Sequence, residues 1–308
     1  MNANQNPLPS DTEQKTRKVR QLFSLDIRTR IVTGILGTGA LALAVFIYFA
    51  LNQTMQVTSA LDKRLETSVK QLAEEQLLNT ASTQAGGINQ SFEAVMEEVT
   101  TLAHGWVLLQ EQRWTLSQNP YWDASTELVQ LEGGQYGNSD ADPSSVFVPV
   151  GIPLDNALLK DLNVSAYLDF TAPEIIKDYP SLLAVYAIDE RGVTRYYPNI
   201  GLASVVPPDF DTTQRPYYVI TAPLFNPQRK TRWAIPYVDA TGGGLVVTVA
   251  APVYRGDQFK GIVAADMQLI GITEQINNIK VGQTGYAFMI DDAGRILSMP
   301  QAGLEMFD

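Results

Sequence analysis

The sequence has no cysteine, and His104 is its only histidine. The absence of cysteine excludes disulfides, thiolate catalysis and cysteine-ligated metal sites. A single histidine cannot form a multi-histidine metal site, and it argues against a Ser-His-Asp triad. Basic residues are also few, with 22 Lys and Arg against 33 Asp and Glu, and the formal net charge of -11 argues against nucleic acid as a partner.

Charge is missing altogether between Arg30 and Asp62, although the 308 residues are 45% apolar and otherwise typical of a folded chain. Within that gap, Ile31 to Leu51 is apolar apart from small residues. At about 1.5 Å per residue, such a helix crosses a hydrocarbon core of roughly 30 Å. The sequence therefore predicts a transmembrane helix at 31–51.

Basic residues before this run set the predicted orientation. The positive-inside rule places the basic tail, residues 1–30, in the cytoplasm, and the residues after 51 outside the plasma membrane. A cleaved signal peptide is the rival interpretation, but both the apolar run and its basic leader are long for one. A buried soluble helix fits less well, because the run is apolar on all sides. The basic residues are Lys15, Arg17, Lys18, Arg20, Arg28 and Arg30.

Residues 52–118 read as one long extracytoplasmic helix, which Pro120 would end. An apolar stripe on one face of it could pair with a second copy of the chain, as in a homodimer, or pack on its own domain. Gly86 and Gly87 either interrupt this helix or only weaken it. The stripe consists of Leu61, Leu65, Val69 and Leu72.

Residues 132–145 are a loop by composition. Asp140 and Asp142 within it could suggest a cation site, but two carboxylates lack the remaining ligand spacing, so a solvated loop is favoured. Beyond the loop, apolar runs joined by short turns predict three hairpins and a helix. The expected strands are 182–188, 193–197, 245–254, 259–267, 286–290 and 295–298, and the expected helix is 270–279.

The first and third hairpins resemble each other at a constant offset of 102 residues. Ile188, Asp189, Gly192 and Pro198 align with Ile290, Asp291, Gly294 and Pro300. Coincidence is the alternative, since acidic turns are common. We interpret the match as two related α/β modules in tandem, the second incomplete after residue 308.

The order of these elements resembles the double Cache sensor domain of bacterial receptors. The resemblance rests on Gly282-Gln-Thr-Gly-Tyr-Ala-Phe-Met-Ile-Asp-Asp-Ala-Gly294, on Phe210-Asp-Thr-Thr-Gln-Arg-Pro-Tyr-Tyr218, on Pro236-Tyr-Val-Asp239 and on Gly261-Ile-Val-Ala-Ala-Asp266. It implies an α+β chain of tandem PAS-like modules with antiparallel sheets: a membrane-distal, ligand-binding module at 119–270, then a linker helix and the start of a membrane-proximal module at 271–308. It also implies a sensor rather than an enzyme, with any kinase, phosphatase or cyclase output beyond residue 308.

The residues themselves suggest a pocket for a small zwitterion. The guanidinium of Arg215 can grip a carboxylate through two hydrogen bonds, and Tyr217 and Tyr218 add aromatic walls. Asp266 ends an apolar strand, where a carboxylate needs a partner such as an ammonium group. Tyr237 and Asp239 could reach the same space. The alternative is that Arg215 only pairs with Asp266 or Asp211 and that the tyrosines are core residues.

The resemblance adds one more residue and a ligand class. Amino-acid-sensing members carry a tyrosine, an arginine, tryptophan-tyrosine, a later tyrosine and a later aspartate at the ligand. Arg215, Tyr218, Tyr237 and Asp266 match this pattern, whereas Phe210 stands in place of the first tyrosine and Tyr217 in place of the tryptophan. The leading hypothesis is thus a membrane-anchored sensor of an amino acid, amine or carboxylate, with no cofactor or metal. A self-associating ectodomain without a ligand and an extracellular hydrolase are the alternatives.

Overall fold

The computed structural model describes residues 26–281, 285–290 and 294–305. The chain divides into two compact units, Met1–Gln76 and Leu77–Asp308. The predicted turn at Asp291 and the residues after Glu305 lie outside the described residues. Each unit is described by itself.

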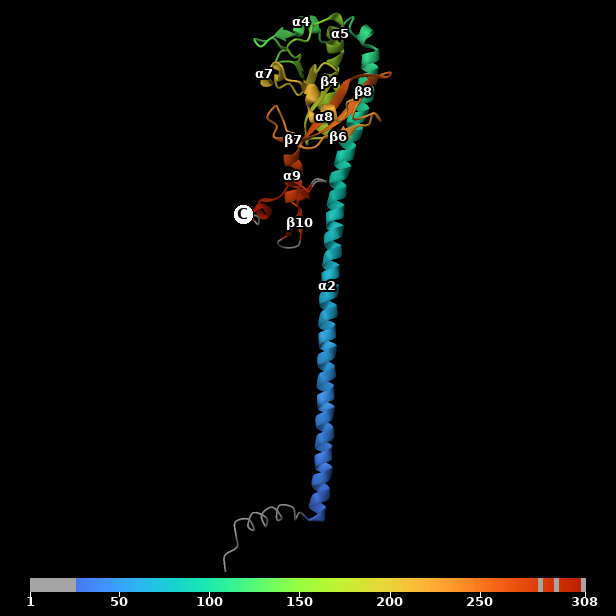
Figure 1. Cartoon of the computed structure of the whole chain (residues 1–308), viewed down its shortest axis with the longest axis vertical. Helices are drawn as coiled ribbons and strands as arrows, with labels where there is room; N and C mark the ends of the chain where they lie inside the picture. The colour runs from blue at the N-terminus through green and yellow to red at the C-terminus, as the bar shows by residue number, and fades with distance from the viewer. Residues whose placement is uncertain (1–25, 282–284, 291–293, 306–308) are drawn as a thin grey trace, which may run out of the picture. The chain divides into compact units, whose positions relative to one another are not determined.

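The first unit, as far as it is described, consists of the N-terminal part of one helix, α2 (Ile27–Glu111) (Figure 1). This helix contains an apolar window long enough to cross a membrane, and none of that window is buried. The stripe Leu61, Leu65, Val69 and Leu72 is also exposed, at 53–65% of each side chain's accessible surface. The first unit therefore offers apolar surface at both the predicted membrane segment and the predicted pairing segment.

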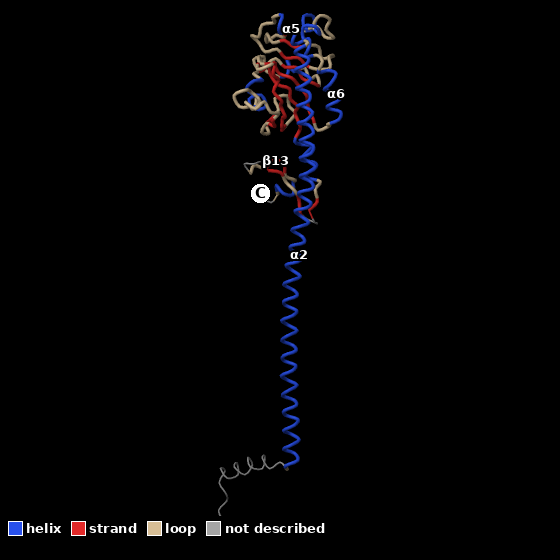
Figure 2. The backbone as a smooth tube through the Cα atoms, turned by 90° about the vertical axis from the view of Figure 1, so that its right-hand side faces the viewer, coloured by secondary structure: helices blue, strands red, loops and turns tan. Residues whose placement is uncertain are grey.

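The second unit is built on one antiparallel sheet. Its strand order is β3-β5-β4-β9-β8-β6, and β7 pairs with β8 as well. Strands are red in Figure 2. The two longest strands, β8 and β9, form its centre and pair from Val246–Gln268 to Arg255–Gln258. The strands are β3 (Ser145–Phe147), β4 (Leu182–Asp189), β5 (Thr194–Tyr197), β6 (Arg232–Trp233), β7 (Tyr237–Val238), β8 (Leu245–Arg255) and β9 (Gln258–Gln268).

Short helices and three two-stranded ladders complete this unit. The helices are α3 (Arg113–Leu116), α4 (Ala124–Glu127), α5 (Asn156–Ser165), α6 (Leu168–Asp178), α7 (Leu202–Val205), the 3-10 helix η1 (Thr212–Gln214), α8 (Pro216–Val219), α9 (Leu269–Asn277) and α10 (Gln301–Leu304). The ladders pair β1 (Val129–Gln130) with β2 (Tyr136–Gly137), β10 (Lys280–Val281) with β11 (Gly285–Tyr286), and β12 (Met289–Ile290) with β13 (Ile296–Ser298).

The sheet separates two apolar clusters, because successive side chains of a strand point to opposite faces. On β4, Val185 and Ala187 pack with α2, α6 and α9, whereas Tyr186 and Ile188 pack with α7 and α8. We call these the helix face and the loop face of the sheet. Val95–Trp106 is the part of α2 that is buried against the helix face. The same strands thus form the base of two different environments.

Two glycines allow the strands to meet as they do. In the β4–β5 turn, Gly192 has φ +83°, while the Asp189 carboxylate accepts hydrogen bonds from the backbone N–H of Arg191 and Val193 at 2.8 and 2.9 Å. On β9, Gly261 has φ +125°, and a Cβ atom there would lie 1.9 Å from the carbonyl oxygen of Ile188. Only glycine fits such an approach, so Gly261 sets the spacing of β4 and β9.

The structure corrects several predicted boundaries. Helix α2 ends at Glu111 and not at residue 118; the chain turns at Gln112, and α3 follows. The Gly86-Gly87 pair does not interrupt α2. The loop at 132–145 contains β2, and the region before residue 182, for which the sequence predicts no element, holds α5 and α6. The four strands predicted between residues 182 and 267 are present as β4, β5, β8 and β9, and the predicted helix 270–279 is α9.

Candidate functional site

The candidate site is a narrow cavity of about 30 Å³ on the loop face of the sheet. Six of the seven sequence-predicted residues line it, on β7 and the loop after it, on β9, on α8 and on the segment that leads into α8. A cavity of this size has room for about two water molecules. The six residues are Phe210, Arg215, Tyr217, Tyr237, Asp239 and Asp266.

Asp266 forms the base of the cavity and is 3% exposed. Tyr186 donates a hydrogen bond of 2.8 Å to its Oδ1, Thr248 donates one of 2.5 Å, and the Tyr237 hydroxyl lies 3.4 Å from the same oxygen. Burial raises the pKa of Asp266 to about 7, although the three hydroxyls lower it. The site therefore holds a carboxyl group near its titration point at neutral pH.

Arg215 stands at the mouth of the cavity, half-buried. Its position follows from the local sequence: Asp211 caps η1 by accepting from the backbone N–H of Thr213, and Pro216 begins α8 directly after Arg215. The guanidinium carbon lies 5.3 Å from the ring centre of Tyr237 and 5.7 Å from that of Phe210. The guanidinium also donates to the carbonyl oxygen of Val238 at 3.4 Å.

The alternative role considered for Arg215, an ion pair with Asp266 or Asp211, is not seen among the described residues. Instead, Tyr237 stands between the two charged groups. Its ring lies beside the guanidinium of Arg215, and its hydroxyl contacts both Thr248, at 2.7 Å, and Asp266. The positive and negative groups of the site are therefore kept apart by a tyrosine and do not neutralise each other.

Asp239 shapes the loop that follows β7. Its Oδ2 accepts hydrogen bonds from the Thr241 hydroxyl and, at 2.8 Å, from the backbone N–H of Gly243. Its own backbone N–H donates to the carbonyl oxygen of Gly244. This loop, with Ala240 and Thr241, forms one wall of the cavity. Asp239 therefore faces the cavity and also holds the wall in place.

Tyr218, the seventh predicted residue, does not line the cavity. Its hydroxyl donates to the carbonyl oxygen of Asp189 at 3.2 Å, and its ring packs edge-on against Phe259. Tyr217, the residue before it, does line the cavity and lies 5.7 Å, centre to centre, from the ring of Tyr237. Because both tyrosines belong to the short helix α8, only one of the two adjacent rings reaches the site.

Sequence reasoning missed the residues that hold Asp266. Tyr186 stacks on Tyr196 at 5.5 Å and meets Tyr217 edge-on at 5.6 Å, so the base of the cavity is a tyrosine cluster. The sequence signal for these residues was the alternation of side chains along the strands. On β4, Tyr186 shares the loop face with Ile188. On β8, Thr248 pairs directly with Asp266 of β9. A polar residue opposite a buried aspartate marks a shared site.

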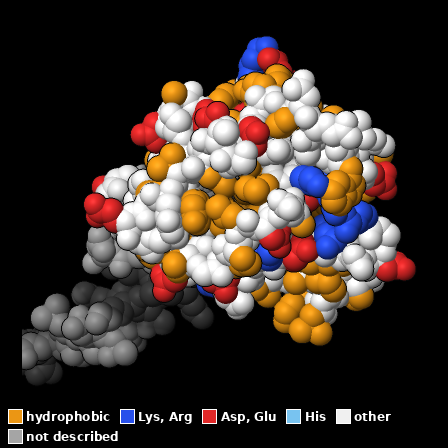
Figure 3. Space-filling view, turned by 90° about the horizontal axis from the view of Figure 1, so that it is seen from above, with side chains coloured by type: hydrophobic (Ala, Val, Ile, Leu, Met, Phe, Trp, Pro, Cys, Tyr) orange, Lys and Arg blue, Asp and Glu red, His pale blue; other side chains and the backbone are white. Residues whose placement is uncertain are grey.

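No group of three or more His, Asp or Glu side chains in the described part of the chain could hold a metal ion. Asp142, half of the pair that could have suggested a cation site, accepts hydrogen bonds from the indole of Trp122 at 3.2 Å and from Asn138 at 2.7 Å. These contacts tie the loop together. Seen from above, the surface of this unit carries acidic side chains scattered among apolar patches, with a group of basic side chains on the right (Figure 3).

The comparison with protein families identifies the fold. The family model of the Cache domain, in its double form, matches residues 65–304. The chain belongs to the double Cache family. The matched range includes the C-terminal part of α2, the whole seven-stranded sheet and the described ladders β10–β11 and β12–β13.

Individual relatives share shorter segments with this double Cache chain. The methyl-accepting chemotaxis protein PctB of Pseudomonas aeruginosa is 33% identical over 97 residues, which are 32% of this chain and 15% of PctB. McpC of Bacillus subtilis is 31% identical over 92 residues, 30% of this chain and 14% of McpC. The matched segments thus span about one seventh of these chemotaxis proteins.

Among solved structures, the chain is similar to the ligand-binding domain of the Pseudomonas aeruginosa amino acid chemoreceptor PctC in complex with GABA. The TM-score is 0.45 at 21% identity, over 72% of this chain and 73% of that one. The ligand-binding domain of PctB in complex with L-Gln gives a TM-score of 0.34 at 30% identity, over 40% of this chain and 47% of that one.

Proposed function

We propose that this chain is the membrane-anchored, extracytoplasmic sensor part of a signalling receptor and that it binds a small amino acid or similar zwitterion in the tyrosine-lined cavity. One observation carries the proposal: Arg215 and Asp266 face one cavity from opposite ends, and Tyr237 separates them. A ligand with a carboxylate at one end and an ammonium at the other satisfies both groups. The sensor segment itself performs no catalysis in this proposal.

The hydrogen bonds at Asp266 indicate where the ammonium binds. The three hydroxyl contacts described for this carboxylate all reach Oδ1. Oδ2 is thus the oxygen for an ammonium group, and a positive charge beside it favours the ionised form of Asp266. Arg215, half-buried at the mouth, is placed for the ligand's carboxylate. The aromatic rings between them fit an apolar side chain.

The ligand-free cavity is smaller than an amino acid, so binding requires a wall to move. The 239–244 loop is the candidate wall, because it lines the cavity and contains Gly242 and Gly244 at φ +91° and +82°. A ligand that prefers the open arrangement shifts the equilibrium between the two arrangements. Displacement of the sheet against α2 would then carry the signal as a shift of about 1–2 Å.

Anchoring and pairing belong to the same proposal. The exposed apolar window of α2 supports a membrane span with the basic tail in the cytoplasm. The exposed stripe at Leu61, Leu65, Val69 and Leu72 supports a homodimer through α2. Replacing Leu65 and Val69 with Glu would lower the dimer fraction in sedimentation experiments on the full chain in detergent, and an unchanged fraction would refute this pairing.

Calorimetry on the full chain in detergent tests the ligand site. The titrants are the standard amino acids, 4-aminobutyrate, simple amines and simple carboxylates. We expect saturable heat with at least one zwitterion and a loss of at least about 100-fold in affinity for Arg215→Ala, which leaves the ligand carboxylate unpaired. Arg232→Ala is the matched control, because that arginine on β6 donates to the carbonyl oxygen of Phe225 outside the cavity. The proposal fails if no titrant binds, or if both substitutions act equally.

A further inference from the structure

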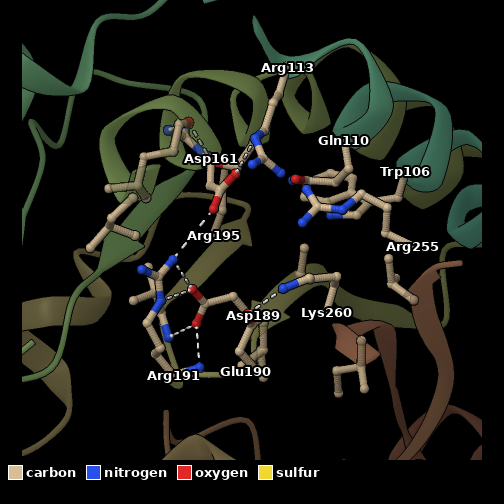
Figure 4. Close-up of a pocket in the computed structure, with 18 of the residues that line it drawn as sticks. Trp106, Gln110, Arg113, Asp161, Asp189, Glu190, Arg191, Arg195, Arg255 and Lys260 are labelled. Atoms are coloured by element: carbon tan, nitrogen blue, oxygen red, sulfur yellow. Dashed lines mark hydrogen bonds and ion pairs between the residues drawn. The ribbon is translucent and has the colours of Figure 1, made fainter. Parts of the chain in front are cut away.

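A second cavity lies on the helix face of the same sheet and differs from the first in size and charge. Its volume is about 200 Å³. Trp106 and Gln110 of α2 form one side, Leu158 and Asp161 of α5 another, and strands of the sheet form the base (Figure 4). The cavity therefore lies between α2 and the sheet.

The charges around this cavity do not balance. Three acidic side chains line it, and each has a cationic partner: Asp161 with Arg113 and Arg191, Asp189 with Arg191, and Glu190 with Lys260. Five cationic side chains line it, so two positive charges are in excess within the lining. The cationic residues are Arg113, Arg191, Arg195, Arg255 and Lys260.

Arg195 is one of the two cations in excess. It is 1% exposed, donates to the hydroxyls of Ser165 and Ser144 at 2.7 and 2.9 Å, and has Asp169, outside the lining, at 3.9 Å. Burial lowers the pKa of Arg195 to about 10, so it is charged at neutral pH. Arg195 is thus compensated by Asp169 and held by hydrogen bonds, which leaves Arg255 as the lining cation without an acidic partner among the described residues.

Arg255 is the second lining cation without an acidic partner in the lining. It ends β8, is half-buried, and has no ion-pair or side-chain hydrogen-bond partner among the described residues. Figure 4 shows its side chain on the same side of the cavity as Gln110 and Trp106. A half-buried guanidinium that faces a cavity without a partner is ready to receive an anion.

Arg113 supports the same conclusion. Its Nε lies 3.6 Å from Oδ1 of Asp161, too far for a hydrogen bond, and both atoms are buried without a hydrogen-bond partner in the described structure. Burial also raises the pKa of Asp161. A buried donor without an acceptor destabilises the protein, and an anion in the cavity would supply the missing acceptor.

We propose that this cavity is a second ligand site, which takes a small organic carboxylate gripped by Arg255 and Arg113, with its apolar part against Trp106. The apolar lining from Trp106, Leu158 and Val253 favours an organic anion over an inorganic one. Because its walls come from α2, α5 and the sheet, an occupied site ties α2 to the sheet. The ligand then acts on the helix that leads to the predicted membrane span.

Binding is tested on the full chain in detergent at constant ionic strength. The probes are acetate, butyrate, succinate, citrate and inorganic phosphate, read by calorimetry and by tryptophan fluorescence, which Trp106 reports from the cavity wall. We expect saturable binding of at least one carboxylate and a loss of at least about tenfold in affinity for Arg255→Gln. Arg255→Lys keeps the charge but not the two-pronged donor, and we expect an intermediate loss.

Two control variants separate this site from the first. Arg215→Ala removes the cation of the tyrosine-lined cavity, and carboxylate binding that is lost in this variant but kept in Arg255→Gln belongs to the first cavity and overturns the proposal. Arg232→Gln removes an arginine outside both cavities and leaves carboxylate binding unchanged. The proposal is overturned if no carboxylate binds saturably, if phosphate alone binds, or if Arg255→Gln and Arg255→Lys bind as the unsubstituted chain does. An equal loss in Arg232→Gln overturns it too.

Discussion

The two faces of the sheet bury charge in opposite ways. On the loop face, the carboxylate of Asp266 is surrounded by hydroxyl groups, that of Asp239 is bound by its own loop, and Arg215 stands apart at the mouth. On the helix face, acidic and basic side chains are already paired, and Arg255 is the lining cation that lacks an acidic partner among the described residues. The first arrangement suits a ligand that carries both charges, and the second suits an anion. A single sheet can therefore serve two chemistries, because alternate residues of each strand face different surroundings.

Both cavities depend on one shared sheet, and Gly261→Ala would disrupt both of them at once. A Cβ atom at Gly261 would lie 1.9 Å from the backbone oxygen of Ile188, so β4 and β9 must separate. We expect a loss of about 4 kcal/mol or more in the free energy of unfolding, or no folded protein at all. Thermal or urea unfolding of the full chain measures it.

Gly271→Ala is the matched control for that substitution. A Cβ atom at Gly271, in α9, meets nothing within 4 Å, and alanine is the better helix former by about 1 kcal/mol. Its stability should be unchanged or slightly higher. Equal stability of the two variants would contradict the role assigned to Gly261.

Asp266→Asn sharpens the difference between the faces. Removing the charge should weaken zwitterion binding at least about 100-fold, because the ammonium loses its partner. It should also stabilise the ligand-free protein at pH 8. The pKa of Asp266 is raised from 3.8 to about 7, so the folded state holds this proton more tightly than the unfolded chain, and stability falls as pH rises from about 4 to 7. The gain in the free energy of unfolding for Asp266→Asn is on the order of a few kcal/mol at pH 8 and disappears near pH 4.

Asp161→Asn is the counterpart on the helix face. Asp161 does not line the tyrosine cavity, so zwitterion affinity should not change. Because asparagine at this position would carry no negative charge, the positive charges of Arg113 and Arg191 would be less neutralised, and the affinity of the second cavity for carboxylates should rise. Unfolding curves and calorimetry on Asp266→Asn and Asp161→Asn at pH 4.5 and pH 8 test these expectations. A loss of zwitterion binding in Asp161→Asn would show that the two sites are not separate.

The pH dependence of binding should differ in sign between the cavities. An ammonium needs ionised Asp266, so zwitterion affinity should fall about tenfold per pH unit below about 7 and level off above it. On the helix face, burial raises the pKa of both Asp161 and Asp189, so acid removes negative charge and carboxylate affinity should rise. Titrations between pH 5.5 and 8.5 test the slope that Asp266 sets, and titrations extended down to pH 4 test the sign on the helix face. The other charged groups of the tyrosine-lined cavity are Arg215 and Asp239. Those of the second cavity are Arg113, Glu190, Arg191, Arg195, Arg255 and Lys260.

Tyr186→Phe has the smallest expected effect. It removes one of the hydroxyl donors to Asp266, worth about 1.5–3 kcal/mol for a bond to a charged group, part of which Thr248 and Tyr237 retain. Zwitterion affinity at pH 7 should fall three- to tenfold, and the midpoint of its pH dependence should move upward. Tyr218→Phe is the control, since that hydroxyl bonds a backbone oxygen outside the cavity. Equal effects would contradict the assignment of the two tyrosines.

The parts of the fold that the sequence predicts well are those with strong local patterns. Long apolar strands joined by acidic turns identify β4, β5, β8 and β9, and a carboxylate at the end of an apolar strand identifies Asp266. Helix α6 was missed because Pro173 lies inside it and reads as a breaker. Helix α5 does carry a signal, since Asp155 caps it by accepting from the N–H of Leu158.

Neither site could be fully predicted from the sequence. The motif around Arg215 led to the first, but the choice between Tyr217 and Tyr218 depends on how α8 packs. The second has no local signal at all. Its charges come from α3, α5, β4, the β4–β5 turn, β5, β8 and β9, and only the folded sheet brings Arg113 and Arg255 to one cavity.

One residue described above borders both cavities. Ile188, next to the last residue of β4, is among the lining residues of each cavity, and its side chain packs on the loop face. If each cavity takes its ligand, a shift of β4 that widens one cavity also changes the other. The two ligands would then bind with heterotropic cooperativity, and the effect of the first on the affinity of the second would equal the reverse effect. The protein would then respond to the combination of two solutes, and not to the amount of either alone.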